Sequence, residues 1–141
     1  MRDLQRFLDA QNRGDTYERA LAELRDGRKV SHWMWFVFPQ RAGLGQSAMS
    51  REYAIDSPEE ARAYFEHPVL GLRLVECAEA LLTHVDRSAE EIMGGIDAVK
   101  LRSSMTLFAR AAPEQPVFAQ VLDRYFEGAA DSAGWFAGDA P

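Results

Sequence analysis

The sequence has a single cysteine, Cys77, and only three histidines in 141 residues. One cysteine cannot form a disulfide within the chain, and the histidines at positions 32, 67 and 84 lack the close spacing of a helical zinc site. A charged-then-apolar leader is also missing. We therefore expect a cytoplasmic protein with no metal site and no cofactor. Cys77 falls on the apolar stripe of a predicted helix, which indicates a buried thiol rather than a nucleophile.

Long apolar runs and positive charge are scarce as well. The longest unbroken apolar stretch is the short run 33–39, far below the roughly 20 residues of a membrane span, so no membrane partner is expected. Sixteen Lys and Arg against 22 Asp and Glu give a net charge of -6, which disfavours nucleic acid as a partner. Residues 1–52 nevertheless carry nine of the 16 basic residues and seven of the acidic ones. A local basic patch in the first third stays open.

What the sequence does have is helical periodicity. The hydrophobic fraction of 47% and the charged fraction of 27% are those of an ordinary globular domain. Apolar residues at helical spacing predict helices near 3–12, 15–26, 58–66, 68–81, 97–108 and 115–127, with a short turn at 88–94. We expect a mainly α fold, a compact single domain of about six helices over residues 1–128. Residues 129–141 are predicted to form a flexible tail unless Trp135 and Phe136 dock.

Several predicted helix ends carry capping residues. The run 57–60, Ser-Pro-Glu-Glu, combines an N-cap hydroxyl, a proline at the first helical position and an acidic first turn. Asp15 precedes Glu18 by three residues, which resembles a capping box, and Ser88 with Glu91 is expected to open the short turn at 88–94. We expect Asp97 to cap the helix over 97–108, and Gly27 to end the helix over 15–26.

One segment, residues 28–40, is chemically unusual. It combines two cations and a histidine with four aromatic side chains, the groups that hold a planar ring bearing phosphate, and stacking contributes about 1 to 3 kcal/mol per base. The alternative is that the aromatics are core, since each buries on the order of 150 to 250 Å². We expect Phe36 and Phe38 in the core, whereas His32 and Trp33 stay open between the two interpretations. The backbone near residues 30–40 is predicted to be a short strand or an irregular buried segment.

A second segment, residues 97–108, offers a polar helix face. Lys100, Ser103 and Ser104 share that face at helical spacing, and a cation above two hydroxyls suits a phosphate or a ribose. The alternative is structural, because helical Ser and Thr often bond to a carbonyl one turn earlier and Lys100 can pair with Asp97. Both interpretations stay open.

Five stretches of the sequence carry a family resemblance. They are Ser-His-Trp-Met-Trp-Phe-Val-Phe-Pro-Gln at 31–40, Gly-Leu-Gly at 43–45, Tyr-Ala-Ile at 53–55, His-Pro-Val-Leu-Gly at 67–71 and Lys-Leu-Arg-Ser-Ser-Met-Thr-Leu-Phe at 100–108. Together they resemble the domain of unknown function 1810 family over residues 3–131. The resemblance implies a small, mainly helical bacterial protein, and it implies no activity.

The resemblance has one departure and one remote extension. Members of that family usually continue past a Gly-x-x-Asp region with a Thr- and Leu-rich stretch, whereas here Asp131 is followed by Ser-Ala-Gly-Trp-Phe. The departure affects the final helix of the family fold or a pocket wall formed by that helix. The order of an aromatic-Pro segment, a Ser-Pro-Glu-Glu-Ala helix, a Lys-led helix and a late Asp is similar to the NAD- and ADP-ribose-associated (NADAR) superfamily.

These observations lead to one functional hypothesis and one alternative. We expect a cleft between the 31–40 segment and the 100–108 helix to bind a small nucleotide-like or phosphorylated ligand, with hydrolase-type activity left open and no catalytic residue assigned. The alternative is a non-enzymatic interaction module or a homodimer that uses exposed aromatics of 33–38. The candidate ligand-binding residues are Arg28, Lys29, His32, Trp33, Gln40, Lys100, Arg102, Ser103 and Ser104.

Overall fold

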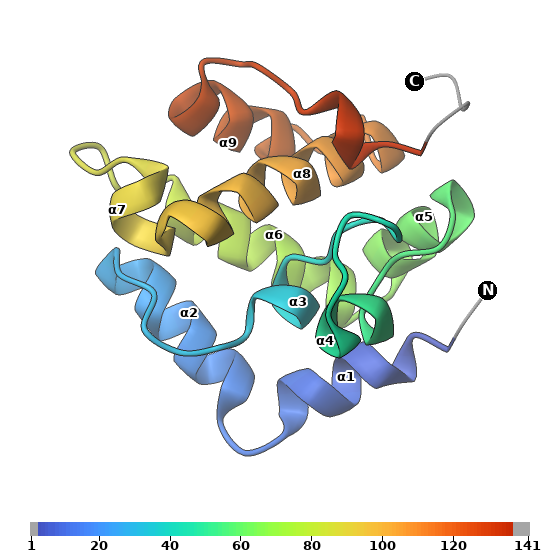
Figure 1. Cartoon of the computed structure of the whole chain (residues 1–141). Helices are drawn as coiled ribbons and strands as arrows, with labels where there is room; N and C mark the ends of the chain where they lie inside the picture. The colour runs from blue at the N-terminus through green and yellow to red at the C-terminus, as the bar shows by residue number, and fades with distance from the viewer. Residues whose placement is uncertain (1–2, 137–141) are drawn as a thin grey trace.

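The computed structural model describes residues 3–136, which form nine α-helices and one 3-10 turn (Figure 1). In chain order they are α1 (Gln5–Asn12), α2 (Thr16–Asp26), α3 (Met34–Val37), α4 (Ala48–Glu52), α5 (Pro58–Glu66), α6 (Leu70–Leu81), α7 (Ala89–Met93), α8 (Gly95–Ala111), α9 (Val117–Phe126) and the turn η1 (Ser132–Gly134). Of these helices, none is both long and apolar enough to cross a membrane. The mainly α prediction is confirmed.

The predicted number of about six helices is wrong, because α3, α4 and α7 form where loops, turns or a strand were expected. Residues 30–40 contain no strand. The backbone N–H of Val37 instead donates to the Trp33 carbonyl at 3.1 Å, which closes one helical turn. Within residues 3–136, β-pairing is limited to an isolated parallel β-bridge between Arg41 and Ile55. Without a neighbouring strand to pair with, the segment satisfies its backbone locally.

The core is built around α6 and α8. Helix α6 packs against α2, α5 and α9, and α8 packs against α5, α7, α9 and η1; Figure 1 shows α6 running through the middle of the molecule. A chain of four buried aromatic rings, Phe7, Tyr64, Phe108 and Phe118, joins α1, α5, α8 and α9, with successive centroids 5.0, 5.4 and 5.8 Å apart. This chain fixes α8, and α8 carries half of the site described below.

The capping predictions are confirmed in part. Ser57 accepts a hydrogen bond from the N–H of Glu60, and Ser88 forms a full capping box at the start of α7. Gly27 ends α2 in the left-handed conformation, at φ 78°. The other two predictions are wrong: the side chain of Asp15 makes no cap hydrogen bond, and Asp97 lies inside α8, which begins at Gly95.

The segment after α9 returns along α8, as the red ribbon in Figure 1 shows. The Arg102 guanidinium donates to the carbonyls of Ala129 and Ala130 at 2.7 and 3.1 Å, and Trp135 is buried. Docking of the aromatic pair, which the sequence left as an alternative to a flexible tail, therefore occurs within residues 129–136. The domain boundary at 128 stays a prediction, and residues 137–141 of the predicted tail lie outside the described residues.

Candidate functional site

A pocket of about 380 Å³ lies between the loop 40–45 and α8. Its volume falls in the range of about 300 to 1,000 Å³ that is typical of small-molecule sites. It is lined by three apolar side chains, by the backbone of one glycine and by four polar side chains. These are Leu44, Ile96, Val99, Gly45, Gln40, Lys100, Ser103 and Asp131. The pocket therefore offers an apolar wall, one cation and one carboxylate.

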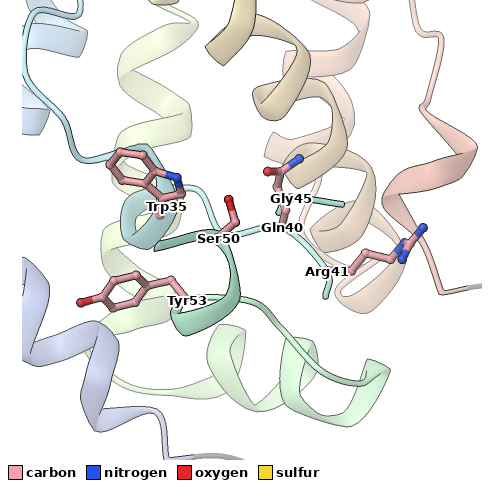
Figure 2. Close-up of a pocket in the computed structure, with 6 residues that line it drawn as sticks. All are labelled: Trp35, Gln40, Arg41, Gly45, Ser50 and Tyr53. Carbon is pink, nitrogen blue, oxygen red and sulfur yellow. The ribbon is translucent and has the colours of Figure 1, made fainter. Parts of the chain in front are cut away.

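A small cleft of about 10 Å³ adjoins this pocket and shares Gln40 and Gly45 with it. Figure 2 shows its six lining residues: Trp35, Gln40, Arg41, Gly45, Ser50 and Tyr53. The Arg41 side chain points away from Trp35 in this view, and its Nε donates to the Ala133 carbonyl at 2.6 Å. Arg41 thus lines the cleft while its Nε holds η1.

Lys100 connects the pocket to the cleft. Its Nζ lies 5.4 Å from the centroid of the Trp35 ring, within the distance of a cation–π contact. Trp35 is only partly buried, so part of its indole remains accessible. The site therefore presents an aromatic ring beside an ammonium group at the edge of a pocket with an apolar wall.

The charge of Lys100 is only loosely compensated. Its Nζ lies 3.8 Å from Oδ1 of Asp97, whereas the other oxygen of Asp97 lies 2.9 Å from Nζ of Lys29. The sequence alternative in which Lys100 pairs with Asp97 is therefore present, but the shorter ion pair belongs to Lys29. Of the two lysines, Lys100 is the one that lines the pocket.

The carboxylate of Asp131 enters the pocket wall from the segment after α9. Its Oδ2 accepts from the Ser103 hydroxyl at 2.7 Å, and its Oδ1 accepts from the N–H of Ala133 at 3.0 Å. Its own N–H donates to Oγ1 of Thr106 at 3.0 Å. Despite the departure that follows Asp131 in the sequence, this segment does form one side of the pocket.

Trp33 does not reach the pocket. It is 1% exposed, and its indole N–H donates to Oε1 of Glu23 at 2.9 Å. Burial alone would raise the pKa of Glu23, but hydrogen bonds from Ser31, Val30 and Trp33 outweigh burial and hold that pKa below its ordinary value. Trp33 is therefore a core residue, and the predicted stacking role is incompatible with its position. Phe36 and Phe38 are buried as expected.

The structure brings three of the nine predicted ligand-binding residues, Gln40, Lys100 and Ser103, into one pocket. Ser104 is fully buried in α8, and Arg102 is bound to the carbonyls described above. Arg28 and His32 are exposed and line neither the pocket nor the cleft. Lys29 also lies outside both, because its ammonium is held by Asp97 and by the Ser31 carbonyl at 2.6 Å.

The other residues that line the pocket and the cleft are not among the nine predicted ones, and two of them, Trp35 and Asp131, supply the aromatic ring and the carboxylate of the site. Trp35 is one of the four aromatics of the 28–40 segment, and the sequence alone assigns it neither to the core nor to the ligand; in the structure the turn α3 directs Trp35 and Phe36 to different sides. Asp131 was noticed only as the end of the resemblance. Its place in the pocket wall depends on the return of the chain along α8, and the spacing of residues in the sequence does not predict this long-range contact.

A second hollow, of about 550 Å³, is larger but less suited to a ligand. It is lined by Leu82, Gln120, Asp123 and Arg124. Leu82 is the one apolar residue among these four, and Nη1 of Arg124 already donates to the carbonyls of Leu82 and His84 at 3.1 and 2.9 Å. Among residues 3–136 no group of three or more His, Cys, Asp or Glu side chains is arranged to hold a metal ion.

Comparison with known proteins now places this fold. The crystal structure of the conserved hypothetical protein Rv1873 from Mycobacterium tuberculosis is similar, with a TM-score of 0.90 and 48% sequence identity over 94% of this chain and 93% of that chain. No functionally curated protein matches the chain. Neither the similar crystal structure nor the search of curated proteins indicates a relationship to the NADAR superfamily, so that likeness stays a prediction. The sequence pattern of the family described as protein of unknown function (DUF1810) matches residues 1–135, and the chain belongs to this family.

Proposed function

We propose that this protein binds a small nucleotide-like or phosphorylated ligand in the pocket between the loop 40–45 and α8. The observation that carries the proposal is the position of Lys100, which lines the pocket and whose ammonium lies 5.4 Å from the centroid of the Trp35 ring. An ammonium group holds an anion as a point charge, and an indole face stacks on a flat ring. One ligand with both features would use both side chains at once.

The local charge supports an anionic ligand. Among the charged residues that line the pocket and the cleft, Lys100 and Arg41 are cations and Asp131 is a carboxylate, two positive charges against one negative charge. This local excess of one positive charge lies in a chain with a net charge of -6. An anion is therefore attracted to this place rather than to the surface in general.

The apolar wall supports a ligand with a ring or another flat apolar part. Leu44, Ile96 and Val99 line the same pocket, and the last two are 76% and 64% exposed. Covering such side chains contributes about 25 cal/mol per Å² of apolar surface removed from water. A bare inorganic phosphate would gain none of this, so we expect it to bind more weakly than a nucleoside monophosphate.

The proposal is one of binding and does not include hydrolysis. Ser103 and Asp131 are paired by a hydrogen bond of 2.7 Å, but none of the residues that line the pocket or the cleft is a histidine. A serine nucleophile needs a general base that takes its proton. Here the serine already donates to a carboxylate that a backbone N–H also holds, an arrangement that fixes the wall.

The experiment is a calorimetric titration of AMP, adenosine and inorganic phosphate into the wild-type protein and two variants. We expect AMP to bind more tightly than either of its parts, and Lys100→Met to weaken AMP about tenfold or more while leaving adenosine within about twofold. Arg28→Gln removes an equal charge outside the pocket and serves as the matched control. Equal affinity of wild type and Lys100→Met for AMP would refute the proposal.

The alternative function is a non-enzymatic interaction module or a homodimer. In the structure it would need a surface other than the aromatics of 33–38. Trp33, Phe36 and Phe38 are buried, so the aromatics of 33–38 do not form an exposed patch. The exposed apolar residues Ile96 and Val99 would have to supply the contact instead. Light scattering across a concentration series tests it: a dimer that Val99→Lys dissociates would favour this alternative over a small ligand.

A further inference from the structure

Resting on the proposed function, we infer that Lys29 is a positioning residue that keeps Lys100 available for an anionic ligand, through competition for a single carboxylate. Lys29 itself lines neither the pocket nor the cleft. Its effect on the ligand would pass through Asp97, which both lysines share.

The three side chains form an unequal triad. Oδ2 of Asp97 lies 2.9 Å from Nζ of Lys29, a close ion pair, and Oδ1 lies 3.8 Å from Nζ of Lys100, near the limit of an ion pair. The Lys29 side chain is 8% exposed and that of Lys100 is 26% exposed. Since burial strengthens an ion pair by reducing solvent screening, Asp97 is held mainly by Lys29.

Lys29 is itself fixed in place. Its ammonium donates to the Ser31 carbonyl at 2.6 Å and lies 4.9 Å from the centroid of the Trp33 ring. Trp33 and Ser31 are in turn both bound to the buried carboxylate of Glu23. Lys29 therefore stays beside Asp97, whereas Lys100, one helical turn along α8, has the longer contact with Asp97 and lies beside the ring of Trp35 at the pocket.

Removing Lys29 should reverse this balance. Without it, Asp97 would pair with Lys100 alone and draw the ammonium away from the pocket. An ion pair at a partly exposed site contributes up to about 1 kcal/mol, which corresponds to an affinity change of up to about fivefold. We therefore expect Lys29→Gln to weaken AMP binding about three- to fivefold.

The test combines AMP titration with crystal structures of the ligand-free variants. Lys29→Arg keeps the charge and should restore the AMP affinity to within about twofold, and Asp97→Asn should tighten AMP binding. Arg28→Gln removes one positive charge from the residue directly before Lys29, so it controls for the effect of net charge on AMP binding. In ligand-free Lys29→Gln, we expect the distance of 3.8 Å between Lys100 and Asp97 to shorten to about 3 Å.

The outcomes separate this inference from the proposed function. If wild type binds no AMP, the proposed function fails, and the distance between Lys100 and Asp97 in Lys29→Gln still decides the competition. If Lys29→Gln and Arg28→Gln weaken AMP equally, only general charge matters and the inference is overturned. An unchanged distance between Lys100 and Asp97 overturns it as well. Should Lys29→Gln fail to fold, Asp97→Asn decides: unchanged or weaker AMP binding contradicts the competition.

Discussion

The indole N–H of Trp33 donates a hydrogen bond of 2.9 Å to Oε1 of Glu23, and both residues are more than nine-tenths buried. The same oxygen accepts from the N–H groups of Val30 and Ser31 at 2.9 and 3.0 Å. One carboxylate on α2 therefore fixes the backbone that leads into α3, and α3 carries Trp35 to the cleft. The position of the site thus depends on a residue that lies outside it.

Removing this carboxylate should be costly. Glu23→Ala leaves the buried N–H of Trp33 and two backbone N–H groups without their acceptor, and we expect the free energy of unfolding to fall by about 3 kcal/mol. Glu23→Gln keeps an amide oxygen for these donors and should cost about 1 kcal/mol. Urea denaturation measures both, with Glu18→Ala, an exposed change on the same helix, as the control. Equal losses for Glu23→Ala and Glu18→Ala would contradict the account.

The same carboxylate predicts a loss of stability in acid. The hydrogen bonds hold the folded-state pKa of Glu23 below the ordinary value of 4.5. Its contribution is therefore complete above the unfolded-state pKa and is lost as the pH falls through the folded-state pKa. Wild type should be more stable than Glu23→Gln at about pH 6, and this advantage should shrink by about pH 3. An advantage of the same size at both pH values would contradict the role of the ionised carboxylate.

Cys77 should be inert in the folded protein. It is fully buried on α6, its Sγ lies 3.8 Å from the hydroxyl oxygen of Tyr17, and burial raises the pKa of the thiol to about 12. The thiolate, which is the reactive form, is therefore almost absent near neutral pH. We expect no reaction with a thiol reagent such as dithiobisnitrobenzoate at about pH 8, and one equivalent after denaturation in urea. Rapid labelling of the native protein would refute the burial of Cys77.

The return of the chain along α8 should depend on a glycine. A Cβ at Gly134 would lie 2.7 Å from the Ser103 carbonyl oxygen and 3.0 Å from Cβ of Thr106. Gly134→Ala should therefore displace the segment that carries Asp131 and cost about 1 to 3 kcal/mol. At Gly95, in the first turn of α8, a Cβ would meet nothing within 4 Å. Thermal unfolding of Gly134→Ala and Gly95→Ala tests this difference, and equal stability of the two variants would argue against tight docking.

Local signals in the sequence predicted much of the fold. The cap at Ser57, the start of a turn at Ser88 and the stop at Gly27 all act within one turn of the backbone, and all three are confirmed. Asp97 shows the limit of such reasoning. Its spacing resembles an N-cap, but an ion pair of 2.9 Å with Lys29, 68 positions earlier in the chain, defines its role.

The site was harder to predict than the fold because its residues come from segments far apart in the sequence. Gln40, Lys100 and Ser103 were found because they lie in the two unusual segments. Trp33 and Trp35 have the same side chain two positions apart, yet one is buried against Glu23 and the other is only partly buried. The buried acceptor Glu23 on α2 distinguishes them, and that contact is a tertiary feature.

The most direct measurement of the central claim is a titration of 15N-labelled protein with AMP, followed through the indole N–H signals of its three tryptophans. We expect the Trp35 signal to move with AMP in a saturable way, together with the amide signals of Gln40 and Lys100. The Trp33 signal should stay in place, because its indole is bound to Glu23 in the core. A Trp35 signal that does not move at millimolar AMP, or that moves equally in Lys100→Met, would contradict the proposed site.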